Sequence, residues 1–261
     1  MVTGLAITGG VGRTVAPPGT DLDELCRLLG VDPDGAAAVV TRRSTRFTYA
    51  FSQADRIDVI VKVGPRDDRG LQTERAALER LDGRVGSVLV PRLRWHGVWH
   101  EQLVVATDAF ETRPTARDID LDEALAVCLA LAGVAGDVSV VHGDLAPWNL
   151  LRTSDGIALV DWESGRFGLD PLFDLTHFVV STGALLGAHS PSAAVALLTH
   201  PGSRGWRYLE ALDVDPEIGP DRVRRYLRRM TTFGNEASRR FRAEMLALLP
   251  DTPSPPSVLG R

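Results

Sequence analysis

Three oxygen-bearing side chains stand close together in the sequence, where short strands are expected to end. Asp144 and Asn149 lie within the segment VHGDLAPWN, residues 141–149, and Asp161 directly follows the apolar run 157–160. One carboxylate could take the proton of an attacking hydroxyl, while carboxylate and amide oxygens are suitable ligands for Mg²⁺. This set therefore has the chemistry that transfer of a phosphoryl group requires.

A lysine and a glutamate that precede this segment could complete the site. The alternating apolar residues from 57 to 63 predict a strand on which Lys62 points to the opposite face. The apolar spacing over 71–81 predicts a helix that carries Glu74, 12 residues after Lys62. Each residue taken alone is also typical of a solvated face, so the information lies in the order of the whole set.

The order of these residues resembles the protein-kinase-like superfamily, and specifically the aminoglycoside phosphotransferase and choline kinase group of small-molecule kinases. The resemblance rests on His-x-Asp-x-x-x-x-Asn at 142–149, a strand followed by Asp161, the upstream lysine and glutamate, and the turn GLDP at 168–171 followed by Asp174. It implies an α+β, bilobal kinase-like fold. A β-rich nucleotide-binding lobe would occupy residues 1–108, and a mainly helical lobe for catalysis and acceptor binding would occupy residues 109–261.

The resemblance also implies a role for each residue of the set. Asp144 would be the catalytic base, and Asn149 and Asp161 would hold Mg²⁺. Lys62 would contact the phosphates of ATP or GTP, and Glu74 would orient that lysine.

Three further elements have supporting roles by the same resemblance. Asp174 would accept hydrogen bonds from backbone N–H groups of the catalytic loop, and His142 would brace that loop. The segment Leu103–Phe110 would form the hinge whose backbone meets adenine.

The sequence departs from the family pattern at the turn that should cover the phosphates. Residues 41–47 read TRRSTRF and contain no glycine. Ser44, Thr45 and the neighbouring arginines would then bind phosphate oxygens, or the turn is simply a solvated basic one; both interpretations stay open. A glycine-rich stretch near the N-terminus, residues 9–14, is not a Walker A motif, because Ile7 and Arg13 stand where glycine and lysine are required.

Two other departures concern the substrate. Asp161-Trp162-Glu163 replaces the Asp-Phe-Gly of protein kinases and no Ala-Pro-Glu follows, which argues against a protein kinase. Only about 34 residues separate the hinge from the catalytic loop, so the acceptor site must use later helices. Three features leave the acceptor open. The acidic residues Asp118, Asp120, Asp122 and Glu123 could face a cationic acceptor or could complement a helix dipole. The arginine-rich helix expected over 221–249 has either a solvated basic face or a surface for an anionic acceptor or partner, and Trp148 either lines the acceptor pocket or packs in the core.

Composition sets broad limits on function. The 261-residue chain is 44% hydrophobic with a formal net charge of −5, which gives no reason to expect nucleic acid or an anionic membrane as a partner. Cys26 and Cys128 are expected to be buried free thiols, and a cytoplasmic protein without a signal peptide or membrane span is expected. Further strands are predicted over 47–51, 88–95, 103–107, 138–141, 150–151 and 157–160, further helices over 22–29, 121–131, 171–183, 191–198 and 206–212, and a disordered tail over 251–261.

The sequence thus favours an ATP- and Mg²⁺-dependent phosphotransferase that moves the γ-phosphoryl group to a hydroxyl of a small molecule. An antibiotic (and hence antibiotic resistance), an amino alcohol, a sugar and a secondary metabolite all remain possible acceptors, and the oligomeric state is open. The alternative is a pseudokinase that binds nucleotide without transferring phosphate, as the glycine-free turn would allow.

Overall fold

The first half of the chain is built around one antiparallel sheet. The structure is a computed structural model that describes residues 21–32, 37–43, 45–53, 56–111, 119–133 and 139–250. Alternating apolar residues place one face of the central strands in a core that includes Tyr49, Phe51 and Val61. The strand order is β1-β2-β3-β7-β6, from β1 (Ala37–Arg43), β2 (Arg46–Gln53), β3 (Arg56–Pro65), β7 (Gln102–Asp108) and β6 (Leu93–Trp99).

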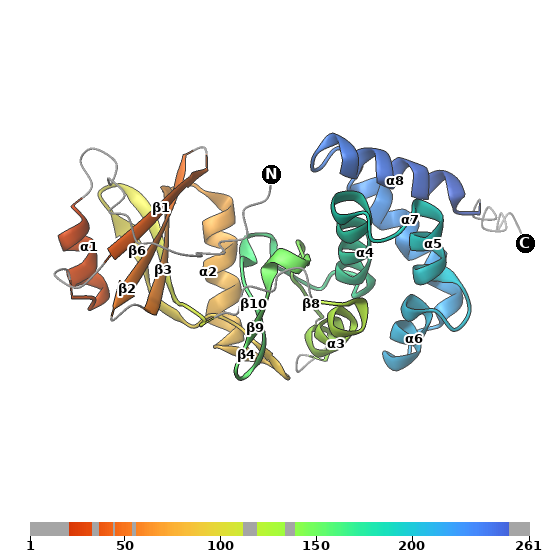
Figure 1. The fold of residues 1–261 in the computed structure, drawn as a ribbon, viewed down its shortest axis with the longest axis horizontal. Coiled ribbons are helices and arrows are strands. Elements are labelled where there is room, and N and C mark those ends of the chain that lie inside the picture. The colour runs from red at the N-terminus through yellow and green to blue at the C-terminus, as the bar shows by residue number, and fades with distance from the viewer. Residues whose placement is uncertain are drawn as a thin grey trace, which may run out of the picture.

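A helix covers each face of this sheet. Helix α1 (Leu22–Leu29) begins at the side-chain cap of Asp21 and packs Leu25 against the core of the sheet. Helix α2 (Arg69–Leu81) begins at the cap of Asp68 and lies on the opposite side, toward the second half of the chain (Figure 1). The sheet and α2 are therefore the elements that can bring a strand lysine and a helix glutamate together.

Short strands and single turns connect the sheet to the helices. The antiparallel hairpin of β9 (Leu150–Thr153) and β10 (Gly156–Leu159) carries the catalytic-loop segment and Asp161 at the same open end, because Leu150 pairs with Leu159, and it extends a small sheet of order β4-β5-β10-β9. These elements are β4 (Arg84–Val85), β5 (Val88–Leu89), β8 (Val140–Val141), β9 (Leu150–Thr153), β10 (Gly156–Leu159) and β11 (Arg166–Phe167), with the 3₁₀ turns η1 (Pro147–Asn149) and η2 (Trp162–Ser164).

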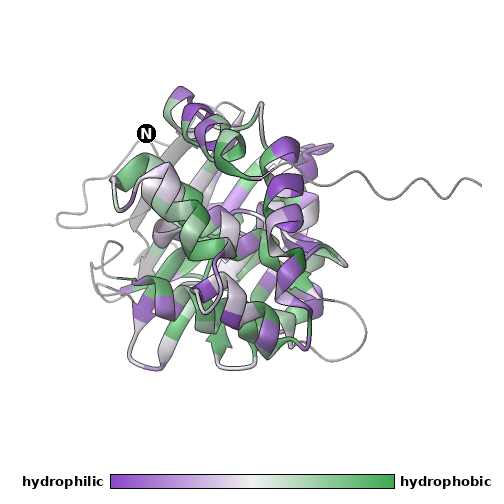
Figure 2. Cartoon of the chain, turned by 90° about the vertical axis from the view of Figure 1, so that its right-hand side faces the viewer, coloured by the Kyte–Doolittle hydropathy of each residue, from purple (hydrophilic) through white to green (hydrophobic). Residues whose placement is uncertain are grey.

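The second half of the chain is mainly helical. Helix α4 lies at its centre, and every residue from Leu172 to Gly183 is buried. Figure 2, which looks onto this end, shows hydrophobic and hydrophilic residues interleaved along the same helices, as amphipathic helices around a shared core require. The helices are α3 (Leu121–Ala132), α4 (Leu172–Leu186), α5 (Pro191–Thr199), α6 (Arg204–Ala211), α7 (Gly219–Arg229) and α8 (Glu236–Leu248), with the 3₁₀ turn η3 (Pro216–Ile218).

The predicted mixed fold, with a sheet-rich first part and a helical second part, is confirmed, while two predicted elements are corrected and one strand is added. The strand expected over 88–95 is interrupted at 90–92, and the strand β1 was not predicted. The helix expected over 221–249 is two helices, because Gly234 takes a left-handed conformation (φ 77°) and Asn235 caps a new helix. Residues 1–20, Ser44, Asp118 and the tail 251–261 lie outside the described residues.

Two expectations about composition can be compared with the described residues. Cys26 and Cys128 are both free and buried, as predicted. Within the described ranges, no helix combines the length and apolar content that crossing a bilayer would need.

Packing of α8 onto the helical core generates a prediction about stability. Met245 of α8 is fully buried, whereas Leu248 on the same helix is 52% exposed. We expect Met245→Ala to lower the free energy of unfolding by about 2 to 5 kcal/mol, because it removes contacts and leaves a cavity. Leu248→Ala should change it by only about 0.5 kcal/mol. Urea unfolding of both variants checks this, and equal losses would show that α8 is not part of the core.

Candidate active site

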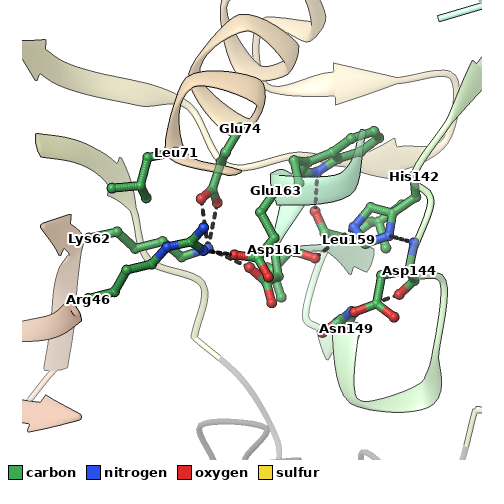
Figure 3. Close-up of polar contacts among 12 residues, drawn as sticks. Arg46, Lys62, Leu71, Glu74, His142, Asp144, Asn149, Leu159, Asp161 and Glu163 are labelled. Carbon is green, nitrogen blue, oxygen red and sulfur yellow. Dashed lines mark hydrogen bonds and ion pairs between the residues drawn. The ribbon is translucent and has the colours of Figure 1, made fainter. Parts of the chain in front are cut away.

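A single ammonium group joins three segments of the chain at the centre of the site. Lys62 Nζ on β3 lies 2.7 and 2.8 Å from the two carboxylate oxygens of Glu74 on α2, and 2.6 Å from Asp161 Oδ1 after β10. Figure 3 shows the three side chains converging from these different elements. The spacing of Lys62 and Glu74 that the sequence predicted is thus realised as a direct ion pair.

The charges of this cluster explain its protonation. Burial alone would lower the pKa of Lys62, but the carboxylates of Glu74 and Asp161 reverse this effect and raise it. Burial raises the pKa of Glu74, with Lys62 opposing the shift and Asp161 adding to it. Lys62 therefore stays charged at neutral pH, between two acidic groups that share one cation.

Asp161 lies on a strained turn that a buried side chain holds in place. Its backbone is left-handed, with φ 68° and ψ 61°, a conformation that costs about 1 to 3 kcal/mol for a residue other than glycine. The next residue, Trp162, is fully buried, and its Nε1–H donates to the carbonyl of Leu159 (2.9 Å). The buried tryptophan fixes the turn, so the Asp161 carboxylate points toward Lys62.

The catalytic-loop residues lie on the other side of Asp161. Asn149 Nδ2 donates to the backbone carbonyl of Asp144 (2.8 Å) and lies 3.3 Å from its carboxylate. Gly143 has φ 82°, and a Cβ there would come within 2.4 Å of the carbonyl oxygen of Ser164, so only glycine fits. The structure thus brings Asp144, Asn149 and Asp161 to one end of the β9–β10 hairpin, as Figure 3 shows.

A buried carboxylate holds the backbone of this loop. Asp174 on α4 accepts the N–H of His142 (2.6 Å) and the N–H of Gly143 (2.8 Å). Burial raises the pKa of Asp174, although His142 and these two N–H groups oppose the shift. The His142 ring donates from Nε2 to the carbonyl of Val160 (2.9 Å) and packs edge-on against Trp162. Both contacts match the bracing expected from the sequence.

His177 contacts Asp144, and the sequence interpretation missed it. His177 Nε2 lies 3.1 Å from Asp144 Oδ1, and its Nδ1 lies 2.9 Å from the hydroxyl of Tyr226. Burial raises the pKa of Tyr226, so its hydroxyl remains protonated and can donate to Nδ1. That bond leaves the hydrogen on Nε2, where it faces the carboxylate. The available signal was that His177 follows Asp174 by one helical turn and so shares its face of α4.

Arg46 is one of the turn arginines considered for phosphate binding, and the structure gives it two carboxylate partners. It lies within the glycine-free stretch 41–47, where it begins β2, and its guanidinium pairs with both Asp68 and Glu163. Glu163 lies two residues after Asp161, so Arg46 connects the β1–β2 hairpin to the turn at Asp161. Of the predicted phosphate-binding pair, Thr45 is exposed at this turn and Ser44 lies outside the described residues.

Three of the four acidic residues considered for a cationic acceptor have structural partners, and the fourth, Asp118, lies outside the described residues. Asp120 and Glu123 form a capping box at the start of α3, and Glu123 also pairs with Arg152. Asp122 pairs with Arg204, 3.0 Å away. Trp148 is half-buried. The helix-capping interpretation of these acids is therefore the one that the contacts support.

The donor set near Asp161 fits a magnesium ion held mainly by oxygen. Asn149 uses its Nδ2 for Asp144, which leaves its carbonyl oxygen for a cation, and the Asp161 side chain is one-third exposed. Within the described ranges, no three His, Cys, Asp or Glu side chains are grouped to hold a metal by themselves. Mg²⁺ commonly takes one or two protein ligands and completes its shell with phosphate and water.

Comparisons with known proteins agree with this geometry. A sequence model described as the phosphotransferase enzyme family matches residues 98–212, which include the catalytic loop and Asp161. No curated protein matches the chain. The match confirms the predicted resemblance to small-molecule kinases and, with the fold, supports a small-molecule phosphotransferase.

Solved structures establish the kinase-like fold. The aminoglycoside phosphotransferase APH(4)-Ia with ADP and hygromycin B is 14% identical, with a TM-score of 0.57 over 88% of this chain and 98% of that one. The amicoumacin kinase hAmiN with AMP-PNP, Ca²⁺ and Ami is 11% identical, with a TM-score of 0.54 over 88% and 95%. The APH(2")-IIa complex with streptomycin and ATP is 11% identical, with a TM-score of 0.52 over 90% and 97%.

The buried bonds of Asp174 generate the second prediction. Asp174→Asn replaces one acceptor oxygen with an NH₂ group, which then faces a backbone N–H. We expect a loss of about 2 to 3 kcal/mol in the free energy of unfolding and faster hydrogen exchange at the amides of His142 and Gly143. Exposed Asp155→Asn is the matched control and should leave both quantities unchanged. Unchanged exchange in Asp174→Asn would mean that this carboxylate does not hold the loop.

Proposed function

We propose that this protein is an ATP- and Mg²⁺-dependent phosphotransferase that moves the γ-phosphoryl group to a hydroxyl of a small molecule. The observation that carries the proposal is the convergence of Lys62, Glu74 and Asp161 beside Asp144 and Asn149 at one end of the β9–β10 hairpin. GTP could replace ATP in the same scheme. We also propose the division into a nucleotide-binding lobe, residues 1–108, and a catalytic lobe, residues 109–261.

Each residue has a task in this reaction. Asp144 accepts the proton of the acceptor hydroxyl, whose oxygen bonds to the γ-phosphorus as the bond to the β–γ bridging oxygen breaks. Lys62, oriented by Glu74, binds phosphate oxygens. The products are the phosphorylated acceptor, the nucleoside diphosphate and a proton, which Asp144 releases to solvent so that the protein returns to its starting state. The contribution of these groups is positional and electrostatic.

The charge balance of the nucleotide side supports a requirement for a divalent cation. Two cationic side chains, Lys62 and Arg46, lie among the carboxylates of Glu74, Asp161, Asp68 and Glu163. The phosphates of a nucleoside triphosphate would be repelled by this excess negative charge unless a cation accompanied the nucleotide. Bound Mg²⁺ would neutralise phosphate charge, and Asn149 and Asp161 would hold it.

The third prediction tests the proposed base. Asp144→Asn preserves the shape of the side chain but cannot accept the proton, so turnover should fall by about 10² to 10⁴-fold while Mg²⁺-dependent nucleotide affinity is retained. Radiolabelled phosphotransfer from ATP to a panel of aminoglycosides, other hydroxylated antibiotics, amino alcohols and sugars measures the first quantity, and calorimetric titration with AMP-PNP measures the second.

Two results would contradict the proposal. Unchanged transfer in Asp144→Asn would exclude Asp144 as the base. Nucleotide binding without transfer to any acceptor in the wild-type protein would instead favour a pseudokinase, for which the glycine-free turn at 41–47 is the motivating feature. Asp155→Asn again serves as the matched control, since it removes one exposed carboxylate outside the site.

The fourth prediction concerns the contact between His177 and Asp144. His177→Ala removes the N–H that faces the carboxylate, so Asp144 can rotate away from the acceptor. We expect kcat to fall roughly 10-fold to 100-fold with the KM for nucleotide unchanged. His177→Gln keeps a donor near the position of Nε2 and should recover part of the loss.

A companion variant separates positioning from folding. Tyr226→Phe removes the hydroxyl that fixes the His177 tautomer but keeps the buried ring, so kcat should fall less than in His177→Ala. Thermal unfolding of each variant provides the control for stability. Equal kcat values for His177→Ala and His177→Gln would exclude a positioning role, because a loss of packing alone would not be rescued by the amide.

A further inference from the structure

A pocket lies on the helical side of Asp144, and two aromatic residues connect it to the base. Phe173 and Tyr226 line this pocket. The Tyr226 hydroxyl lies 2.9 Å from His177 Nδ1, and the Phe173 ring stacks on the His177 ring with centroids 6.4 Å apart. Since His177 Nε2 lies 3.1 Å from Asp144, the pocket wall is one side chain away from the proposed base.

One face of α7 supplies three arginines to the same pocket. Arg222, Arg225 and Arg229 are spaced by three and four residues, which places them on one side of the helix. The only carboxylate among the described lining residues is Asp170, which lies 2.7 Å from Arg222 and 4.0 Å from Arg225. A single acid therefore faces three guanidinium groups.

Arg229 completes this excess of positive charge. Its guanidinium lies 5.9 Å from the centre of the Phe173 ring, and in the part of the chain that the structure describes no carboxylate lies within 4 Å of it. Arg225 and Arg229 are both exposed, so a ligand can reach them. The pocket thus combines an aromatic wall with two accessible guanidinium groups.

We propose that this pocket binds the acceptor through an anionic group, so that the acceptor is a hydroxylated small molecule carrying a carboxylate or a phosphate. The inference rests on the proposed function. Arg225 and Arg229 would pair with the anionic oxygens, for which the planar guanidinium fork is well suited. Phe173 and Tyr226 would pack against the part of the molecule that carries the anionic group, and a hydroxyl on the part that extends beyond the pocket would reach Asp144.

The surroundings argue against a cationic acceptor in this pocket. An amine would meet like charge from α7, and burying unpaired like charges is unfavourable. The acidic residues at the start of α3 that the structure describes are occupied, since Asp120 caps α3 and Asp122 and Glu123 pair with Arg204 and Arg152. Charge thus selects against amines and in favour of acids.

Binding of matched ligands tests the charge preference without requiring turnover. The full chain, saturated with Mg²⁺ and AMP-PNP, is titrated with glucose, glucuronate, glucose 6-phosphate and glucosamine, which share one ring. A second series uses 4-hydroxybenzoate, 4-hydroxybenzamide and tyramine. NMR follows the arginine Nε–H signals. We expect an acid to bind at least about 10-fold more tightly than its neutral and cationic counterparts in one series, and to shift the signals of Arg225 and Arg229. Glucuronate and glucose 6-phosphate distinguish carboxylate from phosphate.

Variants of α7 supply the matched control. The double variant Arg225→Gln and Arg229→Gln should weaken binding of the acid about 10-fold or more, because it removes two charge-assisted partners. Arg228→Gln makes the same kind of charge change on the same helix outside the pocket and should leave binding unchanged. The inference would be overturned if the double variant and Arg228→Gln weakened binding equally. It would also be overturned if the acids in both series bound no more tightly than the neutral and cationic compounds.

Phosphotransfer to the same compounds separates this inference from the proposed function. Transfer only to neutral or cationic compounds would contradict the anionic acceptor and leave the phosphotransferase intact. If acids bind at Arg225 and Arg229 while no compound in either series or in the wider panel is phosphorylated, the proposed function fails although the anion site stands.

Discussion

The site depends on one partly buried ammonium group that must be paired. Lys62 is held between Glu74 and Asp161, and these residues come from the sheet, from α2 and from the turn after β10. Because an unpaired charge in this position would be strongly unfavourable, the three segments cannot separate without a large loss in stability. Docking of α2 on the sheet and the strained backbone of Asp161 are therefore fixed by the same interaction. A group that would meet the phosphates is thus also the group that joins the first half of the chain to the second.

Helix α4 imposes the second constraint, since one of its faces serves both the backbone and the side chain of the catalytic loop. Asp174 accepts two N–H groups of the loop, and His177, one turn later, contacts the carboxylate of Asp144. The helix is buried along most of its length, so neither residue can move independently of the core. Packing of the helical half therefore sets the position of Asp144, whereas the sheet sets the position of Lys62.

Local patterns in the sequence predicted the parts of this arrangement that depend on period and order. Strand alternation and helical spacing placed Lys62 and Glu74, and the order of motifs placed the catalytic loop, because each depends on neighbours within a few residues. The ion pairs of Arg46 were not predicted because its partners Asp68 and Glu163 are 22 and 117 residues away, a distance over which no periodicity carries information. Strand β1, with the sequence AAVVTRR, has no alternation of polar and apolar residues and is a strand only because it pairs with β2. The helix break at Gly234, by contrast, could have been predicted, because the residues around it are poor helix formers.

The two sides of the proposed base differ in charge, and this difference has a physical consequence for which anions each side accepts. On the nucleotide side, carboxylates outnumber Lys62 and Arg46, so anions are accepted only together with a cation. On the other side, the arginines of α7 outnumber Asp170, so an anion can bind without one. A free phosphate-bearing or carboxylate-bearing molecule is thus directed away from the nucleotide site, and a nucleotide accompanied by Mg²⁺ is the species that fits it. Opposite electrostatic signs on either side of Asp144 can therefore keep two anionic substrates in separate places while their reacting atoms meet between them.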